Sequence, residues 1–159
     1  MMSEHLPEDA DAYEQAQYEL RRVDHLIYVS LKYTRTVDVI RNIIARLIST
    51  FDFIWDEFLR RAEKERKIYE LPTAPGAKLN LIRKIYADDD ILLDTVDFYI
   101  LMRQFNNAQY TSEREFRRHV TMKAVFPTGE THEITIDSIT EYYKQAKRHL
   151  EKIGETYFR

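Results

Sequence analysis

The sequence has no cysteine, and its 159 residues include only three glycines and four prolines. Without cysteine, disulfides, thiolate zinc sites and cysteine nucleophiles are all excluded. The absence also fits a reducing compartment, and we therefore expect a cytoplasmic protein. A chain with so few glycines and prolines has few tight turns, which predicts long helices. No segment reaches the roughly 18 uncharged apolar residues of a membrane-spanning helix, so no membrane association is expected.

The charge balance is equally restrictive. The formal net charge is −3, with 32% charged and 44% hydrophobic residues. A strongly basic nucleic-acid binder is not indicated by this total, so any nucleic-acid surface has to be a local patch. The length is sufficient for one domain with a hydrophobic core. We expect a flexible N-terminal tail over residues 1–8 and a single domain over 9–159.

Helical periodicity dominates the chain. Between Val37 and Phe58, apolar residues recur every three or four positions over six turns, on a face wide enough to need more than one neighbour. Thr34 or Thr36 is a suitable N-cap for this helix, and the prolines in 71–76 end it. The same criteria predict further helices over about 9–33, 77–86, 88–107 and 112–119, and a last helix capped by Asp137.

The period changes near residue 120. Apolar and polar residues alternate there, the segment PTGE follows at 127–130, and Ile134 and Ile136 resume the alternation. This pattern predicts a β-hairpin over about 120–136. The predicted fold class is therefore all-α, a bundle of about five helices with a small hairpin before the last helix.

No residue spacing indicates a metal site. The five histidines share no helix face and pair with no carboxylates in a known ligand pattern. The run Asp88–Asp90 is better interpreted as carboxylates at a helix N-terminus, where they stabilise the helix dipole. We therefore expect no metal and no other cofactor.

The segment Arg114–His119 carries the chemistry of most interest. It places three arginines, Arg114, Arg117 and Arg118, within six residues of the imidazole of His119. An imidazole exchanges protons near neutral pH, and a guanidinium holds a phosphate by two parallel hydrogen bonds. These are the groups that RNA cleavage without a metal requires. The alternative is a solvated basic turn at a helix C-terminus.

The order of the predicted elements resembles the HEPN superfamily (higher eukaryotes and prokaryotes nucleotide-binding domain). Two long helices, a short helix and an apolar helix precede Arg-x-x-x-x-His, and the last segment, ITIDSITEYYKQAKRHLEKI, is similar to the closing helix of those domains. The resemblance covers roughly residues 10–155. It implies a homodimer and a metal-independent endoribonuclease of a toxin–antitoxin or defence system, although other members only bind nucleotides or partner proteins. Arg114 and His119 match the catalytic motif of the family.

Two positions depart from the family pattern. Glu115 follows the arginine, where the family often has Asn, Asp or His, and Thr121 stands where some toxins have Tyr. These departures bear on activity rather than on fold.

A second polar cluster lies near the end of the first predicted helix. Steps of four, four and three place Asp24, Tyr28, Lys32 and Arg35 on one side of that helix. Tyr28, Lys32 and Arg35 are candidates for binding substrate together with Arg117 and Arg118. The alternative is an ordinary solvated helix face.

Two hypotheses remain open. The first is a homodimeric ribonuclease in which Arg114 and His119 of both copies face one cleft. The second is a non-enzymatic interaction module that binds a nucleotide or a partner protein, such as an antitoxin of the nucleotidyltransferase type. The apolar faces of residues 37–59 and 91–105 favour a helix-on-helix homodimer in either case.

Overall fold

A computed structural model describes residues 6–158 of the chain. Residues 1–5 of the predicted tail lie outside this range. Five long helices are present in the described part: α1 (Ala12–His25), α3 (Val37–Lys64), α4 (Pro75–Ile85), α5 (Asp90–Asn107) and α6 (Ile136–Tyr157). The first helix continues through a π-helical turn, η1 (Leu26–Ser30), into the short α2 (Leu31–Tyr33). The prediction of a helical bundle is confirmed.

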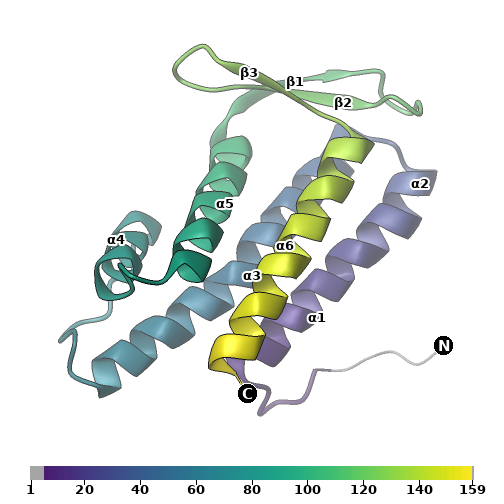
Figure 1. Cartoon of the computed structure of the whole chain (residues 1–159). Helices are drawn as coiled ribbons and strands as arrows, with labels where there is room; N and C mark the ends of the chain where they lie inside the picture. Colours follow the sequence, from purple (N-terminus) through teal and green to yellow (C-terminus); the bar gives the residue numbers. More distant parts are fainter. Residues whose placement is uncertain (1–5, 159) are drawn as a thin grey trace.

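The central helix of the bundle is α3, which contacts α1, α4, α5 and α6. Figure 1 shows α1, α3, α5 and α6 running alongside one another, with α4 at one side and the sheet across one end. Helix α3 buries thirteen residues, which confirms that its apolar face needs several neighbours. None of the helices in residues 6–158 is both long enough and apolar enough to cross a membrane.

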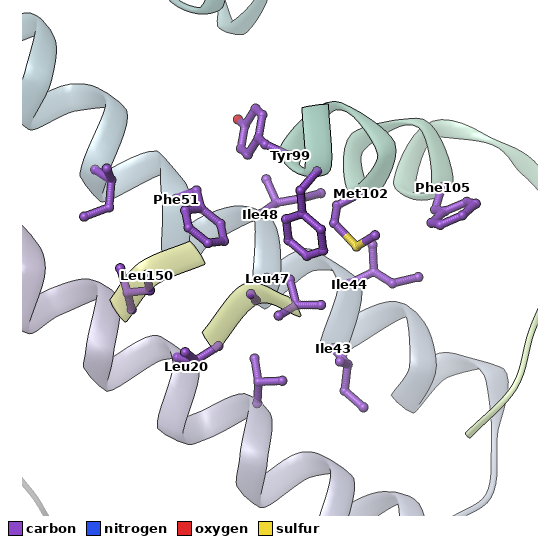
Figure 2. Close-up of a cluster of buried hydrophobic side chains, with 14 of the residues drawn as sticks. Leu20, Ile43, Ile44, Leu47, Ile48, Phe51, Tyr99, Met102, Phe105 and Leu150 are labelled. Carbon is purple, nitrogen blue, oxygen red and sulfur yellow. The ribbon is translucent and has the colours of Figure 1, made fainter. Parts of the chain in front are cut away.

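The core lies between these helices. In Figure 2, Leu47 and Phe51 of α3 lie beside Leu150 of α6 and Leu20 of α1, with Met102 of α5 on the other side. Each fully buried side chain of this size contributes about 1.5–3 kcal/mol to stability. One chain thus buries most apolar residues of α3 and α5 by itself, so their packing does not require a homodimer.

Side-chain caps set the helix starts. Asp11, Thr36 and Asp89 each accept a hydrogen bond from a backbone N–H of the helix that follows. The sequence suggested Thr36 as one of two candidates and placed a carboxylate of the run 88–90 at the start of α5. The last helix is an exception. It is capped by Thr135 in a reciprocal capping box with Ser138, and the prediction that Asp137 is the cap is wrong.

The predicted helix over 112–119 is also wrong. Residues Gln109–Glu113 form strand β1, which pairs antiparallel with β2 (Thr121–Val125), and residues 114–120 are the turn between them. All five β1 side chains are exposed, so the strand carries no apolar period that would have distinguished it from a helix. Backbone pairing with β2, rather than burial, decides its conformation.

The predicted hairpin is present as β2 and β3 (Thr131–Ile134), with Met122 opposite Ile134. Gly129 in its turn has a φ of 90°, a conformation that favours glycine. Together with β1 the hairpin forms a three-stranded antiparallel sheet in the order β1-β2-β3. The protein is therefore mostly helical with a small sheet, and the all-α class holds only in this coarse sense.

Candidate anion-binding cleft

A cavity of about 420 Å³ lies where three segments meet. These are the end of the first helix (η1 and α2), the β1–β2 turn and the start of α6, which gather at the sheet end of the bundle in Figure 1. We call this cavity the basic cleft. Its lining residues are Ile27, Tyr28, Leu31, Lys32, Arg35, Arg118, His119, Thr135, Ile136, Asp137 and Thr140.

The charge of the basic cleft is predominantly positive. Lys32, Arg35 and Arg118 line it, and Asp137 is the only carboxylate among its lining residues. Helix α6 also begins here, and a helix N-terminus carries partial positive charge. The combination favours an anionic ligand with several oxygen acceptors.

The π-helical turn orients the first-helix side of the basic cleft. The backbone N–H of Leu31 donates to the carbonyl of Leu26, a five-residue step that widens the helix locally. Ile27 and Leu31 remain buried, while Tyr28 is 56% exposed and faces the cleft. Single π-helical turns inside α-helices occur frequently at functional sites. Helical periodicity cannot reveal such a turn, because the apolar steps on either side of it stay regular.

The polar cluster on the first helix divides between two environments. Asp24, in the last turn of α1, does not line the basic cleft and accepts a hydrogen bond from the Tyr143 hydroxyl of α6. Burial first, and the Asp24 carboxylate second, raise the pKa of Tyr143 to about 12. Asp24 thus helps to join the first helix to α6, whereas Tyr28, Lys32 and Arg35 line the cleft.

The β1–β2 turn is fixed by two contacts to the α2–α3 connection and to the first residue of α3. The Phe116 N–H donates to the Arg35 carbonyl at 2.6 Å. One residue earlier, the Glu115 carboxylate accepts from the Val37 N–H at 3.2 Å. Both contacts join residues far apart in sequence, and they bring the turn against the rim of the basic cleft.

The backbone of this turn is strained. Arg114 has a φ of 56° and Phe116 a φ of 65°, in the left-handed region where bulky residues are rare. The Arg117 N–H donates to the Arg114 carbonyl, and the Val120 N–H to the Arg117 carbonyl, so the turn is also bonded internally. The strain is therefore held by hydrogen bonds on both sides of the turn.

His119 leaves the turn at the edge of the basic cleft. Its side chain is exposed, and its carbonyl accepts a hydrogen bond of 2.9 Å from the Thr121 hydroxyl. The next residue, Val120, is fully buried. The backbone of His119 is thus held on one side while its imidazole remains accessible to a ligand.

The structure brings five of the seven candidate residues together at the basic cleft: Tyr28, Lys32, Arg35, Arg118 and His119. Arg114 and Arg117 are exposed in the β1–β2 turn and do not line the cavity. Convergence of Arg114 with His119 is therefore not seen within one chain. Glu115, which departs from the family pattern, has a structural role as a partner of the first turn of α3.

Sequence reasoning missed several residues of this region. Asp137 was interpreted only as a helix cap, and Thr140 was not considered, although both line the basic cleft. Their participation depends on how α6 packs against the first helix, which local spacing does not reveal. Two exposed aromatic residues in the segments that line the cleft, Tyr33 and Phe116, were also not singled out.

The structure bears on the acidic run as well. Asp89 accepts from the Leu92 N–H and from the Tyr157 hydroxyl, so its carboxylate caps α5 and anchors the end of α6. Within residues 6–158, no three His, Asp or Glu side chains are grouped so that they could hold a metal ion.

No protein-family model matches the chain, and comparisons with curated proteins and with solved structures give no significant match. The basic cleft is therefore the main structural indication of function.

Proposed function

We propose that the basic cleft binds the phosphate backbone of RNA and that His119 transfers protons during metal-independent cleavage. The observation that carries the proposal is that Lys32, Arg35, Arg118 and His119 line one cavity, with a single carboxylate among the lining residues. Guanidinium groups bind phosphate oxygens by paired hydrogen bonds, and lysine adds a point charge. The resemblance to HEPN ribonucleases at Arg114 and His119 points to the same chemistry.

In the proposed reaction, His119 takes the proton of a 2′-hydroxyl, and the 2′-oxygen attacks the adjacent phosphorus. The bond to the 5′-oxygen breaks, and that oxygen takes a proton from solvent water, which leaves a 2′,3′-cyclic phosphate and a 5′-hydroxyl; the protonated His119 then returns its proton to solvent. Arg35 and Arg118 stabilise the additional charge on the phosphorane oxygens. In a two-fold dimer, a second copy of the chain would bring its own Arg114 and His119 to the reaction.

The test is cleavage of single-stranded RNA in the presence of EDTA. We expect cyclic phosphate ends, and a loss of about 100-fold or more for His119→Ala with an unchanged melting temperature. His25→Ala is the matched control, because His25 is also exposed but does not line the basic cleft. An equal loss for both histidine variants would contradict the assignment, as would activity that requires an added divalent ion.

Binding can be separated from cleavage by salt dependence. Removing Lys32 or Arg35 should weaken RNA binding for all sequences and lower the salt slope by about one unit for each cation removed. Arg117→Ala, outside the basic cleft, should have a smaller effect. Equal effects of all three substitutions would indicate a diffuse electrostatic surface rather than a cleft.

A second candidate function is the binding of a nucleotide without catalysis. The cavity volume of about 420 Å³ lies within the range typical of small-ligand pockets, roughly 300–1,000 Å³. Calorimetric titration with mononucleotides, together with no RNA cleavage at high protein concentration, would favour this function. The resemblance also implies a homodimer and a partner protein of the antitoxin type; light scattering tests the first and co-purification the second.

A further inference from the structure

Two large aromatic side chains are exposed in the segments that line the basic cleft and have no role in the proposed chemistry. Phe116 is 76% exposed and Tyr33 is 79% exposed. The backbone N–H of Phe116 is bonded to the carbonyl of Arg35. The ring of Tyr33 lies 5.9 Å from the ammonium of Lys32. Each ring therefore belongs to a segment that also provides a cation to the cleft.

Phe116 combines a strained backbone with an exposed ring. A phenylalanine at a φ of 65° pays a steric cost that glycine would avoid, and here the ring gains little burial in return. The hydrogen bonds of Glu115 and Phe116 to the start of α3 hold this conformation in place. Packing within the chain does not account for an aromatic side chain at this position, whereas contact with a ligand does.

We propose that Phe116 and Tyr33 are stacking platforms for unpaired bases of an RNA whose phosphates lie in the basic cleft. This inference rests on the proposed function and extends it, because it makes the protein select single-stranded over double-stranded RNA. Bases in a duplex already stack on one another and lie in grooves that exposed rings cannot enter. Unpaired bases present free π-faces, and proteins that bind single strands combine such rings with a basic groove.

The arrangement of the rings favours a nucleic acid over a protein partner. Lys32 is adjacent to Tyr33, and Phe116 stands one residue from Arg117 and two from Arg118. Alternating rings and cations match the alternation of bases and phosphates along a strand, whereas a hydrophobic docking site needs a continuous apolar patch. Tyr28, which is 56% exposed and lines the cleft, offers a third ring on the first-helix side.

The experiment uses the full chain and 2′-O-methyl oligonucleotides of about eight nucleotides, a typical single-strand site size, which lack the 2′-hydroxyl nucleophile and so cannot be cleaved. The first oligonucleotide is a single strand with 2-aminopurine, whose fluorescence is quenched by stacking. The second is the same strand paired with its complement in a duplex. The third is a single strand with the same number of phosphates, in which abasic sites replace bases. We expect quenching on binding, with weaker binding of the duplex and of the abasic strand.

Removal of either ring should weaken binding of the single strand by about 5-fold or more, the lower limit for loss of one base–aromatic stack. Phe116→Tyr should keep the affinity, because it keeps the ring. Phe116→Gly should lower the affinity while raising the melting temperature, because it removes the ring and also relieves the backbone. Tyr69→Ala is the control, since Tyr69 is 94% exposed beyond the opposite end of α3.

The outcomes separate this inference from the proposed function. If Phe116→Ala and Tyr33→Ala bind the single strand as tightly as the unchanged protein, and the abasic strand binds equally well, stacking is wrong and the phosphate cleft stands. If the unchanged protein binds none of the three oligonucleotides, both the inference and the proposed function are overturned.

Discussion

Substitution of Glu115 tests the connection between the β1–β2 turn and α3. The Val37 N–H donates to the half-buried Glu115 carboxylate, at 3.2 Å to Oε2 and 3.4 Å to Oε1, and the two residues are 78 positions apart in the sequence. A hydrogen bond to a charged group contributes about 1.5–3 kcal/mol, and a carboxylate at a helix N-terminus adds about 0.3–1 kcal/mol. Partial exposure reduces both contributions, and water can replace part of the lost bond. We therefore expect Glu115→Ala to lower the free energy of unfolding by about 1–2 kcal/mol.

Urea denaturation followed by circular dichroism measures this change as a lower midpoint at an unchanged m-value. Glu115→Gln keeps an oxygen acceptor without the charge, so it should lose roughly half as much stability. Glu113→Ala is the matched control, because Glu113 is an exposed glutamate on β1, two residues away, and should change stability by less than about 0.5 kcal/mol. If Glu115→Ala is as mild as Glu113→Ala, the contact with α3 contributes nothing and the turn is not anchored in this way.

Two further predictions concern α6. His149 packs against Thr95 and Phe98 of α5, and burial, followed by the nearby charge of Lys152, lowers its pKa below 6.5. The imidazole of His149 therefore binds a proton less readily in the folded protein than in the unfolded chain. The urea concentration at the unfolding midpoint should then decrease as the pH drops below about 6.5, and this decrease should be smaller in His149→Gln. A Cβ added to Gly154 would lie 2.3 Å from the hydroxyl oxygen of Tyr13, and the Tyr13 ring stacks on Phe158. Gly154→Ala should therefore lower the free energy of unfolding by about 1–3 kcal/mol, despite the better helix propensity of alanine. Gly76→Ala, with open space around the added methyl, is the control, and equal thermal stability of the two variants would contradict the packing argument.

The helices were predictable because their signals are local. Apolar spacing and capping residues lie within the segment that they describe, as with Thr36 and the α3 face that follows it. Strand β1 was not predictable by the same means, since its five exposed side chains show no pattern of apolar residues. Its partner strand is also not adjacent in sequence: the nearest paired residues, Glu113 and Thr121, are eight positions apart. The segment 112–119, where a helix was expected, contains several residues with good helix propensity, and tertiary pairing overrides such propensity.

The candidate site was likewise predictable from the sequence only in part. Tyr28 and Lys32 were placed on one side of the first helix by their spacing alone, and both line the basic cleft. That His119 joins them depends on the bond between Phe116 and Arg35, which no sequence pattern signals. Arg114 was paired with His119 from their separation along the chain. The strained turn instead leaves Arg114 outside the cavity.

The position of His119 therefore depends on the folding of α3. The turn that carries His119 takes its anchors from Arg35 and Val37, and Val37 is the first residue of the helix that organises the core. Two residues of the turn adopt left-handed conformations, which cost free energy that the anchors must offset. Loss of an anchor should release that strain and free the turn before it unfolds the bundle. A variant such as Glu115→Ala would then reduce any activity of the basic cleft more than its loss of stability implies, because the imidazole and the cations would no longer be held in one geometry.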